Sequence, residues 1–136
     1  MEVTNDERTL TELDYVRLEK LIREHEHGPD HSAVLAALEA AQCVPSPHIE
    51  PDIVTMGSRA LLMDLRSGET YTLTLCYPPE ARPSAGFISV LSPVGASLIG
   101  RRIAEIARWR TPDGGDGAAQ VMALLFQPEA SGLYTL

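Results

Sequence analysis

The sequence predicts an α+β protein in which helices come first and a mostly antiparallel sheet follows. Three observations predict this class. Residues 11–41 carry apolar side chains at helical spacing, residues 53–77 are rich in strand-favouring residues, and residues 87–100 run from a strand directly into a short helix. We therefore expect a short antiparallel helical hairpin, a small coiled coil, joined to a sheet on which one short helix packs.

The composition is typical of a compact chain. The protein has 136 residues, 44% of them hydrophobic, and a formal net charge of −8. A surface that coats DNA or RNA needs clustered Lys and Arg, so we expect no direct sequence-specific binding of nucleic acid. The chain does not start like a signal peptide and has no apolar stretch long enough to span a bilayer. We expect a cytoplasmic monomer with no membrane partner.

The two cysteines, Cys43 and Cys76, form no metal-ligand spacing. Reduced thiols are expected in a cytoplasmic protein. A disulfide between the two cysteines is the alternative.

Residues 1–47 predict the helical hairpin. The first helix runs from about Thr11 to His25, Gly28-Pro29 breaks it, and an alanine-rich second helix has an apolar face that reaches Ala41. Each arm would have about 12–16 residues and reach roughly 20–25 Å at 1.5 Å per residue. The apolar face of the first helix consists of Leu13, Val16, Leu18, Leu21 and Ile22.

Strand patterns begin after Pro51. Residues 53–56 and 58–64 are two β-prone runs, and residues 69–77 alternate apolar side chains with threonines. Such alternation predicts one buried and one solvent-facing side. Ser67-Gly68 between the second and third runs predicts a hairpin turn.

The strand and helix of residues 87–100 meet at a well-marked corner. Residues 87–91 favour a strand, Ser92 can cap a helix, and Pro93 suits its first position, where a missing N–H costs nothing. Gly100 suits a left-handed residue just after the helix.

The last part of the chain predicts two more segments of regular structure. The spacing of residues 103–110 fits a helix or a strand, whereas residues 121–126 form an apolar strand. The glycines of residues 114–117 predict the turn between them. Residues 127–136 are expected to dock on the domain, because they contain Leu133, Tyr134 and Leu136.

Residues 88–100 resemble the signature of the C-terminal domain of bacterial Gre transcript-cleavage factors, and more closely the Rnk family, named "regulator of nucleoside diphosphate kinase". Residues 51–59, 75–80 and 126–134 agree with this resemblance. It implies an FKBP-like fold for residues 48–136, here called the head, and it favours a strand at residues 103–110.

The resemblance also implies a contact surface for RNA polymerase. In Gre factors the Ser-Pro corner contacts the rim of the secondary channel, a helical coiled coil of the largest catalytic subunit. This sequence departs from the Gre pattern by carrying Leu91 where those factors have an acidic residue. The alternative is that the corner is a helix cap and that Tyr77-Pro78 only ends a strand. The implied polymerase-contacting residues are Leu91, Ser92, Pro93, Val94 and Gly95, with Tyr77 and Pro78 as a second edge.

The hairpin tip carries the acidic residues Glu24, Glu26 and Asp30. Gre cleavage factors have two acidic residues at the tip of a much longer coiled coil, where they help to hold the catalytic magnesium. The arm predicted here is too short for that reach. Three histidines also lie near the tip, but exposed turns collect polar residues, so we expect no metal site and no cofactor.

These observations predict a polymerase-binding transcription regulator that docks near the secondary channel, competes with longer Gre-type factors and is not an enzyme. The resemblance implies an indirect influence on nucleoside diphosphate kinase. The alternative is a transcript-cleavage factor that uses the acidic residues of the tip. A prolyl isomerase, suggested by the fold analogy alone, would need an apolar, aromatic-rich pocket that the few scattered aromatic residues do not predict.

Overall fold

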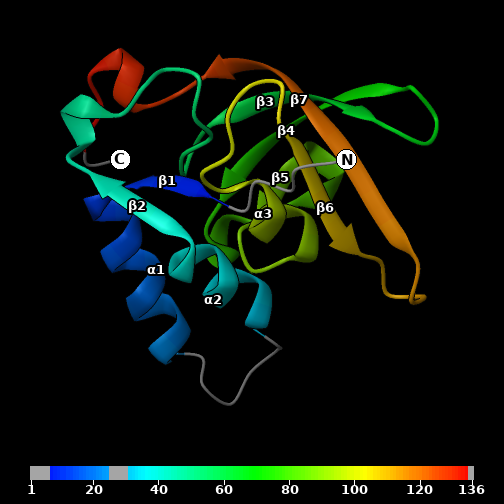
Figure 1. Ribbon diagram of the computed structural model, residues 1–136, viewed down its shortest axis with the longest axis horizontal. Helices are drawn as coiled ribbons and strands as arrows, with labels where there is room; N and C mark the ends of the chain where they lie inside the picture. Colours follow the sequence, from blue (N-terminus) through cyan, green and yellow to red (C-terminus); the bar gives the residue numbers. More distant parts are fainter. Residues whose placement is uncertain (1–6, 25–30, 135–136) are drawn as a thin grey trace.

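The computed structural model of the chain describes residues 7–24 and 31–134, which form a curled sheet with one short helix against it and two further helices beyond that helix (Figure 1). The helices are α1 (Glu12–Glu24), α2 (Ser32–Glu39) and α3 (Pro93–Leu98). The strands are β1 (Arg8–Thr11), β2 (Ala41–Val44), β3 (Arg59–Asp64), β4 (Thr70–Cys76), β5 (Phe87–Ser89), β6 (Ile106–Arg110) and β7 (Asp116–Phe126). Within the described ranges, no helix is long and apolar enough to cross a membrane.

The main sheet has five strands in the order β5-β4-β3-β7-β6. Three of its four pairings are antiparallel, and β4 pairs with β5 in parallel. The expectation of an α+β protein with a mostly antiparallel sheet is therefore confirmed. The predicted turn between β3 and β4 forms: the Asp64 N–H donates to the Glu69 carbonyl at 2.8 Å, and the Asp64 carboxylate accepts the Arg66 N–H at 2.8 Å.

A second, two-stranded sheet was not expected. β1 and β2 pair in parallel, with Arg8 opposite Ala41 and Thr11 opposite Val44. The prediction that the second helix includes Ala41 is wrong, because α2 ends at Glu39 and the next residues pair with β1. Alanine favours helix only weakly, and the pairing with a distant segment decides the conformation here.

The predicted strand at residues 53–56 is also wrong. Ile53 makes one isolated bridge with Arg102, and the rest of the segment lies outside the named strands. The segment is nevertheless buried: Ile53 and Val54 are both 0% exposed. Burial in the core therefore explains the apolar run without sheet pairing.

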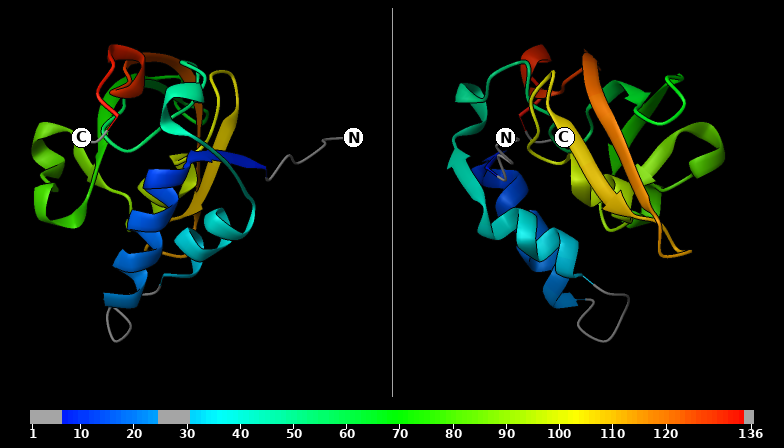
Figure 2. Two further views of the ribbon diagram at one scale, coloured as in Figure 1. Left: turned by 90° about the vertical axis from the view of Figure 1, so that its left-hand side faces the viewer. Right: turned by 45° about the vertical axis from the view of Figure 1, so that its right-hand side comes forward.

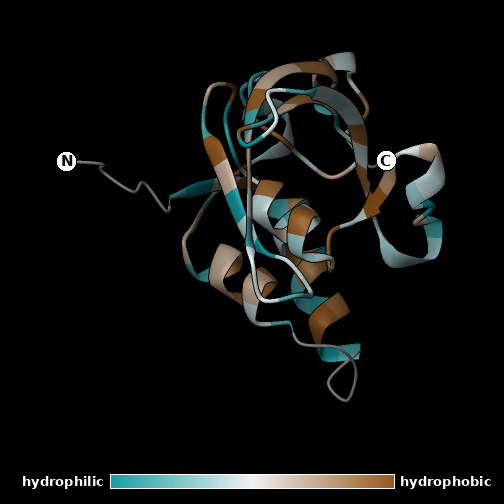
Figure 3. Ribbon diagram, turned by 90° about the vertical axis from the view of Figure 1, so that its right-hand side faces the viewer, coloured by the Kyte–Doolittle hydropathy of each residue, from teal (hydrophilic) through white to brown (hydrophobic). Residues whose placement is uncertain are grey.

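Other boundaries moved by a few residues. β5 ends at Ser89 rather than at residue 91, α3 spans Pro93–Leu98, and β6 starts at Ile106 rather than at residue 103. β7 is longer than predicted, because it continues the pairing with β6 back to Asp116. The strands of the main sheet carry both hydrophobic and hydrophilic residues, as expected for a sheet with one covered face (Figure 3).

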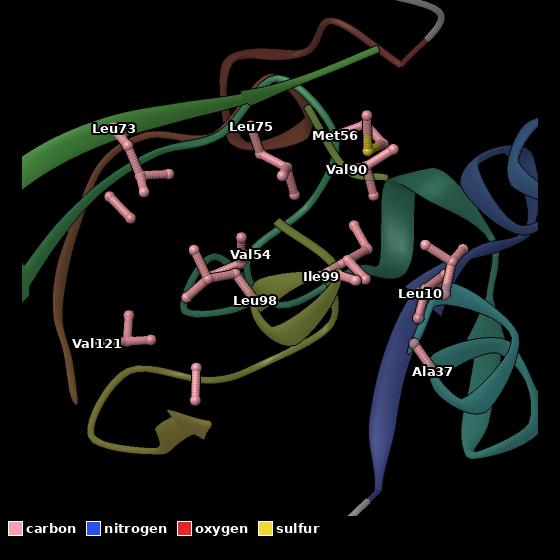
Figure 4. Close-up of a cluster of buried hydrophobic side chains, with 14 of the residues drawn as sticks. Leu10, Ala37, Val54, Met56, Leu73, Leu75, Val90, Leu98, Ile99 and Val121 are labelled. Atoms are coloured by element: carbon pink, nitrogen blue, oxygen red, sulfur yellow. The ribbon is translucent and has the colours of Figure 1, made fainter. Parts of the chain in front are cut away.

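One hydrophobic core joins the first third of the chain to the head. Leu10 of β1 and Ala37 of α2 lie in the same buried cluster as Ile99, Leu98 and Val54 (Figure 4). Gly100 has φ +80° as predicted, and a Cβ there would lie 2.9 Å from Leu10 Cδ1. Helices α1 and α2 lie side by side in both views of Figure 2. The division of the chain after residue 47 stays a prediction.

The segment after β7 docks through its first residues, Gln127 and the buried Pro128, rather than through Leu133 and Tyr134. The Gln127 side-chain amide donates to the carbonyls of Glu50 at 2.8 Å and Ile53 at 2.7 Å. By contrast, Leu133 and Tyr134 are 44% and 41% exposed. This segment therefore docks on the domain as expected, but Leu133 and Tyr134 are not what holds it. Leu136 lies outside the described residues.

Candidate functional site

The corner between β5 and α3 is built by short-range hydrogen bonds. Ser92 is the N-cap of α3, and its Oγ accepts the Gly95 N–H at 3.1 Å, as the sequence predicted. The same hydroxyl donates to the Ser89 carbonyl at 2.6 Å. Pro93 occupies the first helical position. The corner is consequently fixed by its own residues and needs no partner to form.

Gly95 lets α3 pack directly onto the preceding strand segment. A Cβ at this position would lie 2.9 Å from Val90 Cα and closer still to the Ser89 carbonyl oxygen. Real Cβ atoms do not approach backbone so closely, because the interior is already packed to high density. Any side chain at Gly95 would push the corner open.

Arg8 holds the other end of α3. Its Nη1 donates to the carbonyls of Ala96 at 3.0 Å and Ile99 at 2.9 Å. The last carbonyls of a helix lack intrahelical partners, and a cation there is favourable. The sequence analysis missed Arg8, and no local pattern could have revealed it, because it lies 88 residues before Ala96.

The surface of the corner is mostly apolar. Pro93 is exposed, Leu91, Ser92 and Val94 are half-buried, and Gly95 is buried. Leu91 and Val94 also pack against the core cluster. The surface that the corner presents to a partner therefore consists of the Pro93 ring and the exposed parts of Leu91 and Val94.

The start of α3 offers few free N–H groups to a partner. Pro93 has no N–H, and the N–H groups of Gly95 and Ala96 donate to Ser92. Shape and apolar contact, rather than hydrogen bonding to the helix start, are what the corner can contribute to binding.

The structure brings Tyr77 and Pro78 beside this corner. β4 and β5 pair with Cys76 opposite Ser89, and the Val90 N–H donates to the Cys76 carbonyl at 2.9 Å. Tyr77 is half-buried, and burial raises the pKa of its hydroxyl to about 12. Tyr77 and Pro78 thus directly follow the strand residue that pairs with the start of the corner.

A hollow of about 580 Å³ adjoins Tyr77 between α1 and the head. Its lining residues are Arg17, Met56, Gly57, Leu75, Cys76, Tyr77 and Glu80. Cys76 is a free, buried thiol, and Cys43 is a free, exposed thiol.

Asp14 links α1 to the head beside this hollow. Thr11 Oγ1 accepts the Asp14 N–H at 3.0 Å, which is a helix cap, but the Asp14 carboxylate accepts the Met56 N–H at 3.1 Å. Burial raises the pKa of Asp14 to about 6, against the opposing effect of the Met56 hydrogen bond. The buried carboxylate is a structural connection between helix and head.

Glu24, the described residue of the acidic tip, lies at the far end of α1 from the head. Glu24 is the last residue of α1 and is exposed, with its carboxylate 3.8 Å from Lys20 Nζ. Glu26 and Asp30 lie outside the described residues, as do the histidines at positions 25 and 27, so their predicted roles stay predictions. The structure does not bring Glu24 and Pro93 together, because α1 leads away from the sheet (Figure 1).

The first helix has the predicted length, whereas the second is shorter than the sequence predicted. α1 has 13 residues and α2 has 8. At 1.5 Å per residue these lengths correspond to about 20 Å and about 12 Å. The second arm is short because β2 takes up the residues that were expected to extend it.

Comparison with known proteins identifies relatives of the whole chain. The family model "Transcription elongation factor, GreA/GreB, C-term" matches residues 49–125. The "Regulator of nucleoside diphosphate kinase" of Escherichia coli (strain K12) is 35% identical over 129 residues, which cover 93% of this chain and 95% of that protein.

Two further relatives carry the Gre name. The structure of "Prokaryotic transcription elongation factor GreA/GreB from Nitrosomonas europaea" superposes with a TM-score of 0.72 and 30% identity, and covers 88% of this chain and 100% of that one. The "Transcription elongation factor GreA" of Geobacillus kaustophilus (strain HTA426) is 36% identical over 74 residues, 54% of this chain and 46% of that protein. The corner lies within residues 49–125, the part of the chain that the family model matches.

Proposed function

Because the chain belongs to the GreA/GreB family of transcription elongation factors, we propose that it is a transcription regulator that binds RNA polymerase through the corner between β5 and α3. The docking place is the rim of the secondary channel. The protein acts there without cleaving the transcript, and any influence on nucleoside diphosphate kinase is indirect. An FKBP-like head and a coiled-coil pairing of α1 and α2 are part of the same proposal.

One observation carries the proposal: an exposed proline stands at a rigid corner inside the family-matched region. Hydrogen bonds of Ser92 fix the start of α3, and Arg8 fixes its end. A preformed surface loses little conformational entropy on binding. The apolar contact that Pro93 and Leu91 offer supports binding to a helical partner whose face is also apolar.

The short helix pair supports a regulator without cleavage activity. At 1.5 Å per residue, the 13 residues of α1 span about 20 Å, less than the much longer coiled coil that the resemblance implies for Gre cleavage factors. A protein with such an arm would occupy the docking place of a longer factor while its tip stays outside the catalytic centre. It would therefore compete with long-armed Gre factors for polymerase.

Co-purification with core RNA polymerase tests the docking proposal. Wild-type protein is expected to bind, and Pro93→Ala is expected to weaken binding, since alanine keeps a helix start but removes the ring. Pro112→Ala is the matched control, because Pro112 is an exposed proline in the turn between β6 and β7. Equal retention of all three proteins, or of none, would contradict docking through Pro93.

The second candidate function is a transcript-cleavage factor that uses Glu24, Glu26 and Asp30. Only the acidic character of the tip favours it. Stalled elongation complexes with labelled RNA are incubated with the protein and magnesium, with a long-armed Gre factor as the positive control. RNA of unchanged length supports the regulator, and shortened RNA supports the cleavage factor.

A further inference from the structure

The main sheet has an outer face on which none of the buried core residues lies, within the part of the chain that the structure describes. Along β3, Ala60 and Leu62 point into the core with 0% exposure, so the alternate residues Arg59, Leu61 and Met63 point outward. We call this side the outer face. The residues that the strand register places on it from the neighbouring strands are Thr70, Thr72, Thr74, Phe87, Ile106, Arg108, Arg110, Asp116, Ala118, Gln120, Ala123 and Phe126.

One end of the outer face carries two aromatic rings with a cation between them. Register places Phe87 beside Thr74, Thr74 beside Arg59, and Arg59 beside Phe126. Phe87 is 40% and Phe126 is 36% exposed, which is unusual for a sheet residue of this size. Adjacent strands are about 4.8 Å apart, so the two rings stand roughly 14 Å from each other across the row.

A hollow of about 260 Å³ opens beside this row. Its lining residues are Arg59, Thr72, Leu73, Thr74, Ala85, Gly86 and Phe87. Among the described residues, Arg59 forms no ion pair, so its guanidinium is available to an anion from outside. The hollow therefore combines an aromatic ring, hydroxyl groups and a cation, which suit a base, a ribose and a phosphate.

The other end of the outer face is also cationic. Arg108 and Arg110 alternate along β6, and Arg66 lies in the neighbouring turn between β3 and β4. A hollow of about 690 Å³ there is lined by these three arginines and by Trp109, among others. Asp116, opposite Arg110, lines the same hollow, and Asp113 lies close enough to Arg66 for their charges to interact.

Charge is divided unevenly along the chain. Residues 1–52 contain twelve of the nineteen acidic residues and four of the eleven basic ones, which accounts for the whole net charge of −8. Residues 53–136 carry seven of each. Charges beyond a Debye length of about 8 Å are screened at physiological salt, so an anion on the outer face responds to its arginines more than to the distant helices.

We propose that the outer face binds single-stranded RNA without sequence preference. Phe87 and Phe126 stack on bases, while arginines at both ends contact phosphates and the threonine hydroxyls contact ribose and phosphate. The RNA path between the two ends of the outer face follows β7, which has 11 residues. At about 3.4 Å per residue the path is long enough for several nucleotides. This face is separate from the corner, so the proposal does not depend on docking to polymerase.

Fluorescence anisotropy with the full chain and a 5′-fluorescein-labelled oligouridine tests the proposal at low salt. Wild-type protein is expected to bind, and Phe87→Ala is expected to weaken binding about tenfold, since base–aromatic stacking is lost. Tyr134→Ala, which removes a ring of similar exposure from the tail, is the aromatic control. Its affinity should equal that of wild type.

The charged residues are tested by the salt dependence of binding. Replacing Arg59 by alanine should reduce the slope of log affinity against log salt by about 0.7, the value for one phosphate contact on a single strand. Arg23→Ala, on exposed α1, should leave the slope unchanged. Circular dichroism melting of each variant separates loss of fold from loss of binding.

Three outcomes would overturn the proposal: no RNA binding at low salt, equal weakening by the outer-face and control variants, or equal affinity for a polyglutamate peptide. Single-stranded DNA of the same sequence should bind more weakly than the RNA, because it lacks the ribose 2′-hydroxyls that the threonines contact. Phe87→Ala should still co-purify with polymerase. A failure of RNA binding therefore leaves the docking proposal intact, and a failure of polymerase binding leaves the RNA proposal intact.

Discussion

Replacing the buried carboxylate of Asp14 should remove a defined part of the pH dependence of stability. Asp14 is 4% exposed, and its pKa in the folded protein is raised to about 6 from 3.8. The folded state thus holds the proton more tightly than the unfolded state, so stability falls as pH rises from the lower pKa through the higher one. At 1.36 kcal/mol per pKa unit, the full effect is roughly 3 kcal/mol.

Most of this effect falls in an accessible range. Between pH 4.5 and 7.5, the two pKa values give a loss of about 2 kcal/mol from Asp14 alone. Asp14→Asn keeps an oxygen that can accept the Met56 N–H but cannot ionise. The difference in free energy of unfolding between variant and wild type should therefore change by about 2 kcal/mol over this range, in favour of the variant at high pH.

Urea unfolding followed by circular dichroism at several pH values measures this difference. Glu39→Gln, an exposed carboxylate at the end of α2, controls for the general loss of one negative charge. Its difference from wild type should be nearly constant with pH. A constant difference for Asp14→Asn as well would refute the reasoning that burial of Asp14 shifts its pKa.

Two further predictions concern the packing that holds α3. Gly95→Ala should lower the free energy of unfolding by about 1–3 kcal/mol, because the added Cβ meets backbone that cannot yield. The control Gly115→Ala, in an exposed turn, should lower it less. Urea titration measures both variants, and equal losses would contradict the close approach at Gly95. Arg8→Ala should lower the free energy of unfolding by about 1–3 kcal/mol, because two hydrogen bonds to helix carbonyls are lost. Arg23→Ala, at an exposed position, is its control. Equal melting temperatures of the two variants would show that these hydrogen bonds do not stabilise α3.

The sequence predicted best what depends on neighbours in the chain. The Ser92 cap joins residues three apart, and the conformation of Gly100 follows from the end of one short helix. Hydrogen-bonding and backbone preferences at this range are readable from residue type alone. The turn between β3 and β4 was predicted for the same reason.

What the sequence could not show depends on contacts between distant segments. β2 forms because β1 lies beside it, about thirty residues earlier in the chain, and this pairing overrode the helix preference of its alanine-rich surroundings. Residues 53–56 look like a strand because buried segments and strands share apolar residues. The contact of Arg8 with α3 and the burial of Asp14 likewise depend on the folded chain as a whole.

The central claim is that Pro93 faces RNA polymerase at the rim of its secondary channel. A photocrosslinking amino acid in place of Pro93, with the same residue in place of Pro112 as control, tests contact directly. The proposal predicts a crosslink from position 93 to the coiled coil of the largest catalytic subunit, which excess long-armed Gre factor abolishes. No crosslink from position 93, or equal crosslinks from both positions, would contradict it.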